Sequence, residues 1–303
     1  MFYFFPAPGS SFEKKKQIMN TQLSPKPHTL VTGGTGKTGS RIVNRLTQMD
    51  WPVRIGSRSA TIPFDWYNPD TWAPALKDIQ TVYICFQPDL AVPGATSIIR
   101  AFTQQAAQQG IRHVVLLSGR GEQEAQDCEQ IVMQCGINWT IVRASWFSQN
   151  FSEGYLLEPI QAGYVALPAG DVGEPFVDTD DIADVAVAAL TQAGHYGQLY
   201  EVTGPRMYSF AEAIAVIAKA TGRNIQYEYM PIADYTAVME QYEVPADVIA
   251  LLGYLFTEVL DGRNASVTGD IERVLGRPAK DFATYAKETA AAGIWNAPAE
   301  ELK

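Results

Sequence analysis

Three glycines spaced three residues apart follow a short apolar run, His28–Thr32, near the start of the chain. A segment with helical spacing of its apolar residues comes directly after them. Between a strand and a helix, such glycines permit a tight turn, a close backbone approach to a pyrophosphate and close packing of the helix, whose N-terminus favours phosphate. The pattern therefore predicts a dinucleotide site. The residues that we expect to contact the cofactor in this turn are Gly33, Thr35, Gly36, Lys37, Thr38 and Gly39.

Two other interpretations of this turn remain open. Gly36, Lys37 and Thr38 match the end of the phosphate-binding pattern G-x-x-x-x-G-K-[ST], but that pattern needs a glycine at position 31, where the chain has Val31. The glycines could also form a purely structural turn. The strand expected before them and the helix expected after them favour the dinucleotide interpretation.

The end of the second apolar run bears on the choice of cofactor. Pro52–Gly56 is followed by Ser57 and Arg58, and no acidic residue occurs from position 51 to position 64. A site for NAD places an acid here to bind the ribose 2′-hydroxyl, whereas an arginine accommodates the 2′-phosphate of NADP. Because Arg58 can bond a phosphate with two N–H groups, we expect NADPH to be preferred over NADH. The alternative is that Arg58 is only a solvated loop residue.

Short apolar runs alternate along the chain with segments of helical periodicity. These elements position the glycine turn and the loop that holds Arg58. This alternation predicts an α/β fold, a Rossmann-type doubly wound parallel sheet whose ligand crevice lies at the carboxyl ends of the strands. Phe86 and Gln87 end the fourth strand, so we expect both beside the cofactor. The expected strands are His28–Thr32, Pro52–Gly56, Ile62–Phe64, Thr81–Phe86, His113–Ser118 and Trp139–Arg143, and the helices between them are Gly39–Met49, Pro69–Lys77, Gly94–Gln109 and Glu122–Cys135.

Past Ser152 the alternation loosens, which divides the chain into a cofactor domain, 28–152, and a smaller, mostly helical C-terminal substrate lobe, 153–303. Some strands of this lobe could return to the main sheet. Asp178, Asp180 and Asp181 suit a helix cap and its dipole better than a metal site. Strands are expected at Gly163–Leu167 and Gln198–Thr203, one helix through Thr191, and further helices from Ser209, Ala233, Pro245 and Val267.

The composition excludes several classes of protein. The 303 residues carry a net charge of -10, which disfavours a surface that binds nucleic acid or an anionic membrane. Three cysteines and three histidines, all scattered, predict neither a disulfide scaffold nor a metal site, and they fit a reducing cytoplasm. Since no run of about 18 apolar residues occurs, we expect no membrane span. A small molecule is the expected partner.

Residues 1–27 differ from the rest of the chain. A short aromatic patch, Phe2–Phe5, precedes proline, glycine, serine and a run of three lysines, Lys14–Lys16. The apolar run is too short for a signal peptide, and the charge lies on its far side. We expect a disordered extension or a start assigned too early, with Met19 as the more natural first residue.

Further segments carry a resemblance to a known family. With the glycine turn, Trp139–Arg143 followed by Trp146–Phe151, Asp180–Ala186 and Tyr200–Pro205 resemble the NmrA-like, atypical short-chain dehydrogenase/reductase family. The similarity covers nearly all of residues 28–295. It implies an NADP-binding Rossmann domain with a small C-terminal substrate lobe.

A narrower similarity lies in Phe64–Trp72 and in the stretch from Val244 to Phe282. These segments resemble the ergot-alkaloid festuclavine/agroclavine dehydrogenase group and its bacterial relatives. That resemblance implies reduction of an iminium carbon by NADPH, without transferring a substrate. A cationic iminium accepts hydride without a proton donor in the same step, so the protein supplies orientation and excludes water.

The usual catalytic pair of the superfamily is missing. Its typical members use a tyrosine as general acid and a lysine four residues on, whose ammonium lowers the tyrosine pKa. None of the 14 tyrosines of this chain has lysine at that position, and Glu122–Cys135 contains neither residue. Ser118 occupies the place of the family's catalytic serine and could contact substrate. A strand-end serine that bonds nearby backbone is an equally good interpretation.

Aromatic and amide side chains follow the sixth expected strand, where an apolar pocket with a few polar groups would suit a hydrophobic substrate. The alternative is that these aromatic residues pack the two lobes together. The residues that we expect in the substrate pocket are Trp146, Phe147, Asn150, Phe151 and Phe176.

The sequence thus predicts an NAD(P)H-dependent oxidoreductase that reduces a small organic molecule, such as an imine, enone or quinone, by direct hydride transfer. Loss of the Tyr-Lys pair is equally expected in a non-catalytic protein that senses NADP(H) and passes its state to a protein partner, as the regulator that gives the NmrA family its name is thought to do. An aromatic pocket beside the nicotinamide favours the reductase.

Overall fold

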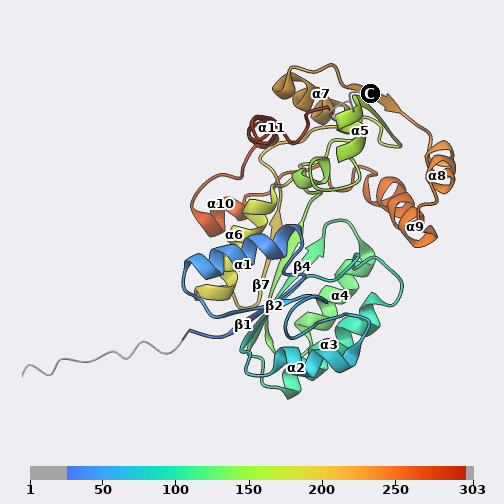
Figure 1. Cartoon of the computed structure of the whole chain (residues 1–303). Helices are drawn as coiled ribbons and strands as arrows, with labels where there is room; N and C mark the ends of the chain where they lie inside the picture. The colour runs from blue at the N-terminus through green and yellow to red at the C-terminus, as the bar shows by residue number, and fades with distance from the viewer. Residues whose placement is uncertain (1–25, 298–303) are drawn as a thin grey trace, which may run out of the picture.

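A six-stranded parallel sheet forms the centre of the molecule (Figure 1). The computed structural model describes residues 26–297, so most of the expected N-terminal extension lies outside the described residues. The strand order β2-β1-β3-β4-β5-β7 places β1 between β2 and β3, so the chain changes direction across the sheet there, at the expected ligand crevice. The strands are β1 (Thr29–Thr32), β2 (Val53–Gly56), β3 (Thr81–Ile84), β4 (His113–Gly119), β5 (Asn138–Ala144) and β7 (Gln198–Val202).

Successive residues of each buried strand pack into different helical layers, because side chains alternate between the faces of a sheet. Leu30 and Val114 join the core beneath one set of helices, whereas Val31 and Val115 join the core beneath the other. This arrangement confirms the expected doubly wound fold. One set comprises α2 (Trp72–Leu76), α3 (Ala95–Gln108) and α4 (Gln123–Met133), and the other comprises α1 (Lys37–Gln48) and α6 (Thr179–Thr191).

A second, mostly helical lobe lies beyond the carboxyl ends of the strands (Figure 1). Its core is a cluster of aromatic rings that includes Phe151, Phe210 and Phe282. A two-stranded parallel sheet of β6 (Tyr164–Leu167) and β8 (Gln226–Tyr229) flanks this core. The helices of the lobe are α5 (Leu157–Ala162), α7 (Phe210–Thr221), α8 (Ile232–Gln241), α9 (Ala246–Tyr254) and α11 (Phe282–Ala291).

The division expected at Ser152 does not follow the structure throughout. As the sequence analysis allowed, strand β7 returns to the main sheet and pairs with β5; helix α6 also packs beneath that sheet with its apolar face. Helix α10 (Asp270–Leu275) also contributes Ile271 to this core. The chain therefore crosses between the lobes more than once.

Two expected elements differ from the structure, and one strand was not expected. The run Ile62–Phe64 forms no strand, because Pro63 cannot donate to a ladder and the Phe64 amide instead donates to the Ser57 carbonyl at 2.9 Å. Strand β8 was not expected, since its sequence, Gln-Tyr-Glu-Tyr, is polar and largely exposed. The helix expected over Pro69–Lys77 is a 3₁₀ turn, Pro69–Thr71, followed by the short α2.

A buried ion pair joins α4 to β5. The Glu129 carboxylate is fully buried and lies 2.5 Å from the Arg143 guanidinium, which also reaches Glu201 at 2.8 Å. Removing one partner of a buried pair leaves the other charge without compensation. We expect Glu129→Ala to lower the free energy of unfolding by about 3 kcal/mol in urea titrations. Asp127→Ala, on the exposed side of α4, is the control; equal stability of the two variants would contradict a structural role for the pair.

Candidate functional site

The glycine turn connects β1 to α1 in the conformation that a dinucleotide site requires. Gly33 has a φ of +62°, which side chains rarely allow, and a Cβ on Gly39 would lie 2.1 Å from the Gly33 carbonyl oxygen. The helix therefore packs directly on the turn. Gly36 precedes α1 with ordinary extended backbone, and no acidic residue occupies the first turn of the helix. This helix end favours a phosphate.

Two cavities meet at the carboxyl ends of the strands, since both are lined by Gln87 and Pro88. The first, of about 460 Å³, includes Gly36, Lys37, Thr38, Phe86 and Gln87; the second, of about 670 Å³, includes Gly33, Thr35, Ser57, Arg58 and Gln87.

Together these cavities form one groove along the glycine turn, and the space in it fits a dinucleotide. A Cβ on Gly36 would lie 3.3 Å from the Gly33 carbonyl oxygen and 3.5 Å from the Gln87 side-chain nitrogen, so any larger residue would enter the space between turn and strand. Gly39 lines neither cavity and serves helix packing.

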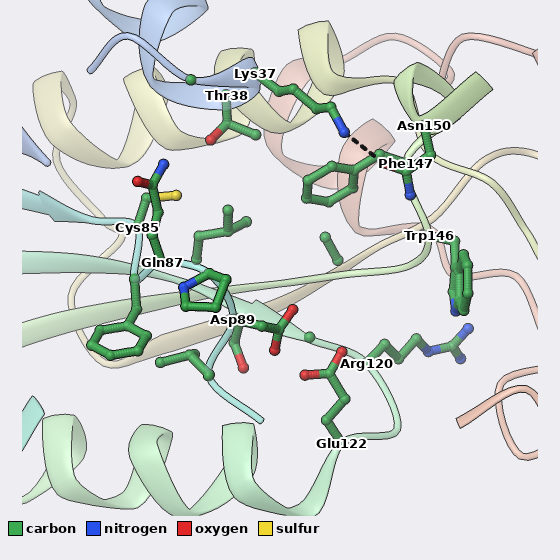
Figure 2. A pocket seen from close by; sticks show the side chains of 18 of the residues that line it. Lys37, Thr38, Cys85, Gln87, Asp89, Arg120, Glu122, Trp146, Phe147 and Asn150 are labelled. Atoms are coloured by element: carbon green, nitrogen blue, oxygen red, sulfur yellow. Dashed lines mark hydrogen bonds between the residues drawn. The ribbon is translucent and has the colours of Figure 1, made fainter. Parts of the chain in front are cut away.

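Lys37 spans the groove from the first turn of α1. Its ammonium donates to the Asn150 side-chain oxygen at 2.8 Å (Figure 2). Burial lowers the pKa of Lys37, and the Arg41 charge adds to this, while Glu153 acts in the opposite direction. An ammonium held against an amide beside the helix N-terminus can also bind a phosphate oxygen. Thr38 is more enclosed, and its hydroxyl accepts from Tyr83 at 3.0 Å.

Arg58 lies at the far end of the groove, beyond β2. Its side chain is exposed, and it lines the second cavity beside Ser57 and Ser59. Asp65 lines the same cavity, but its carboxylate accepts from the Tyr67 amide at 3.0 Å. At this end the cavity thus offers Arg58 and the hydroxyl groups of Ser57 and Ser59 to an anion.

The expected substrate residues divide into two groups. Trp146, Phe147 and Asn150 line the first cavity, joined there by Tyr155 and Leu255, which the sequence did not suggest. Figure 2 shows Trp146 and Asn150 on the side opposite to Gln87. This part of the cavity is enclosed mainly by residues that follow β5 and by the second lobe.

Phe151 and Phe176 do not line the cavity, which corrects the expectation for both. They are 0% and 1% exposed, and their ring centroids lie 5.2 Å apart inside the aromatic core of the second lobe. The 3₁₀ turn Ser148–Phe151 rotates Phe151 away from the side chains before it. The alternative interpretation, packing within the fold, holds for these two rings.

Ser118 borders the first cavity, but its hydroxyl is engaged elsewhere. The side chain is 4% exposed and donates to the Glu129 carboxylate at 2.6 Å. Since Glu129 also binds Arg143, the serine belongs to the buried ion-pair network between β4 and α4. This geometry gives Ser118 a structural partner and no free donor toward a substrate.

Asp89 and Glu122 bring two carboxyl groups to the same cavity, and neither is among the site residues expected from the sequence. Asp89 follows β3 and Glu122 follows β4, so both lie at the carboxyl ends of neighbouring strands. Figure 2 shows their side chains pointing toward one another. Burial raises the pKa of Asp89 and raises that of Glu122 well above its usual range. The available signal was an acid in each of the two loops that follow the expected strands Thr81–Phe86 and His113–Ser118, but that these strands are neighbours comes from the sheet order.

Arg120 and Glu174 stabilise the opposite wall. Arg120 donates to the Asn264 carbonyl at 2.9 Å and to the Ser266 carbonyl at 2.7 Å, which ties the segment before α10 to β4. Glu174 is 1% exposed and accepts from the Trp146 amide at 3.3 Å. Burial raises the pKa of Glu174 to about 7.

The raised pKa of Glu174 predicts a pH-dependent stability. As pH rises from about 4.5 to about 7, the unfolded chain ionises first, so the free energy of unfolding falls, by up to about 3 kcal/mol. Glu174→Gln, which keeps an acceptor for Trp146, should lack this loss. Urea titrations of both proteins at about pH 5 and about pH 8 test it. Parallel losses in the two proteins would contradict the assignment.

Other classes of site find no support in the part of the chain that the structure describes. No group of three or more potential metal ligands gathers among residues 26–297. Over the same residues, no helix has the length and apolar character needed to cross a membrane.

Two family models and several known proteins match this chain. A model of the NmrA-like family matches residues 123–286, and a model described as NAD(P)H-binding matches residues 33–193. The chain is 30% identical to the NAD(P)H azoreductase of Xenophilus azovorans, over 87% of this chain and 98% of that protein. It is 27% identical to the agroclavine dehydrogenase of Claviceps fusiformis, over 86% of this chain and 96% of that protein.

A solved structure shows the same fold. The NADPH-dependent quinone oxidoreductase of Escherichia coli, complexed with NADPH, superposes with a TM-score of 0.73 at 18% identity, over 86% of this chain and 99% of that one. The NAD(P)H-binding model covers the glycine turn that lines the groove, and the relatives named above are reductases or dehydrogenases. The chain is therefore an NAD(P)H-dependent reductase that belongs to the NmrA-like family.

Proposed function

We propose that this reductase uses NADPH to reduce a small, conjugated organic acceptor, an enone, quinone, imine or azo compound, without a Tyr-Lys pair. One observation carries the proposal. The cavity that begins at Gly36 and Lys37 continues without a break to Trp146, Tyr155 and Leu255. A cofactor held by the glycine turn and an apolar acceptor held by the second lobe would therefore share one enclosure.

The residues that would hold the cofactor extend along the whole groove. The backbone at Gly36 and the Lys37 ammonium suit the pyrophosphate, and Arg58 with Ser57 suits the 2′-phosphate. Phe86 and Gln87 would lie beside the nicotinamide. The bound dinucleotide supplies a hydride, and the protein's own contribution is to orient the acceptor and exclude water.

The names of relatives support the range of acceptors. An azoreductase and a quinone oxidoreductase are among the proteins that this chain resembles, and both names denote reduction of flat, conjugated molecules. Trp146 and Phe147 offer rings against which such molecules can stack. An acceptor of this shape suits a cavity of about 460 Å³.

NADPH oxidation tests the proposal. The purified protein is titrated with NADPH, NADP and NADH by nicotinamide fluorescence, and the loss of NADPH absorbance is then followed with cyclic imines, enones, quinones and azo dyes. We expect oxidation above the protein-free rate with at least one acceptor. Tight binding without oxidation across the panel would favour the sensor of NADP(H) instead, and the reductase proposal would fail.

A further inference from the structure

We propose that Asp89 and Glu122 share one proton and donate it to the acceptor as the acceptor takes up hydride. This inference rests on the proposed function, because it assigns a residue pair to that same reaction. The pair would take the place of the missing tyrosine as the source of the proton.

The position of Glu122 is built into the end of β4. Its side chain is 7% exposed, and its Oε2 atom is buried without any hydrogen-bond partner. A Cβ on Gly119 would lie 2.1 Å from the Glu122 Oε1 atom, so the carboxyl group occupies space that only glycine leaves free. Figure 2 shows this carboxyl group directed into the cavity toward Asp89.

The two carboxyl groups need a proton to coexist. Figure 2 shows the two carboxyl groups directed toward each other at the wall of the cavity, and two carboxylates have no hydrogen to donate to one another. Asp89 is already fixed, since its Oδ1 atom accepts from the Ala91 amide at 2.8 Å. A proton held between Asp89 and Glu122 gives the orphaned Glu122 oxygen a partner and removes the repulsion of two adjacent charges.

The surroundings of the pair favour its protonated form. Burial is the largest cause of the raised pKa of Glu122, followed by Asp89 itself, while the amides of Leu90 and Ala91 act in the opposite direction on Asp89. The Arg120 guanidinium borders the same cavity but is engaged elsewhere: it donates to the Asn264 and Ser266 carbonyl groups and pairs with the Glu201 carboxylate at 3.3 Å. The remaining titratable groups that face the pair are Cys85, Glu124, Cys128, Glu129 and Tyr254.

Reduction of a neutral acceptor requires one hydride and one proton. A quinone or azo double bond takes up the hydride supplied by the bound dinucleotide at one end, and the electron pair of the double bond moves to the other atom or to the conjugated oxygen. That atom takes the proton from Asp89 and Glu122. The pair is left with two charges and regains its proton from water. A permanently cationic N-alkyl iminium needs only the hydride, so the pair should matter far less for it.

Two acceptors and two variants test the inference. Turnover of a neutral quinone and of an N-alkyl iminium salt is measured across pH for the wild type, Glu122→Gln and the control Asp127→Asn, which lies on the exposed side of α4. For the quinone, we expect kcat to fall about 100-fold in Glu122→Gln. In the wild type that kcat should fall as pH rises through the pKa of the pair, and in the variant it should not. The iminium rates and the control should stay near wild type.

An infrared difference spectrum provides a readout without turnover. At neutral pH, the wild type minus Glu122→Gln should show the stretch of a protonated carboxyl group; Asp89→Asn is the second variant if the first does not fold. Absence of that band, or equal losses with quinone and iminium, would overturn the inference. If no acceptor oxidises NADPH in the wild type while the band is present, the proposed function fails and the donor role fails with it.

Discussion

Gly36→Val is expected to abolish binding of the dinucleotide while leaving the protein cooperatively folded. Gly36 has extended backbone, with φ of −86°, so valine introduces no backbone strain. Its side chain would instead fill the gap between the Gly33 carbonyl and Gln87, at 3.3 Å and 3.5 Å from the new Cβ. Hydrogen bonds to a charged phosphate contribute about 1.5–3 kcal/mol each, so the loss of two or more weakens binding at least about 100-fold.

Nicotinamide fluorescence measures this loss, and a urea titration measures the fold. Gly170→Val is the matched control, because no atom lies within 4 Å of a Cβ at that position in the second lobe. Both variants should unfold in one transition, and only Gly36→Val should lose NADPH. Retained binding by Gly36→Val would show that the pyrophosphate lies elsewhere.

Arg58→Glu is expected to reverse the preference between the two cofactors. The arginine lines the second cavity with Ser57 and Ser59, and its exposed guanidinium has room to bond a 2′-phosphate with two N–H groups. A glutamate there would repel the phosphate and could accept from the 2′-hydroxyl of NADH. Affinity for NADPH should fall about 100-fold or more, whereas affinity for NADH should change about tenfold or less.

The comparison of both dinucleotides in each protein makes this test specific. Arg100→Glu, on the exposed side of α3, changes the net charge equally and should leave both affinities near wild type. Equal weakening of NADPH and NADH by Arg58→Glu would refute the assignment of this arginine to the 2′-phosphate.

What the sequence determined lies in local patterns. The strand, glycine turn and helix from Thr29 to Gln48 were predictable because each glycine meets a local steric requirement. The buried parallel strands are short apolar runs, and such runs can be recognised from the local sequence alone. The place of Arg58 beside the groove was predicted in the same way, from its distance in sequence to the turn, and its contact with a 2′-phosphate stays a prediction. By contrast, Ile62–Phe64 has the apolar ends of a strand but forms none, because Pro63 cannot donate to a ladder and the Phe64 amide donates to Ser57, a contact that only the structure shows.

The tertiary structure alone decided which side chains share the cavity. Phe151 and Asn150 are neighbours in sequence, yet one fills the aromatic core and the other meets Lys37, because the 3₁₀ turn sends them in different directions. Asp89 and Glu122 lie far apart in the chain and meet because parallel strands β3 and β4 end at the same edge of the sheet. Local spacing specifies a turn, whereas the proximity of distant side chains depends on strand order, which no local pattern encodes.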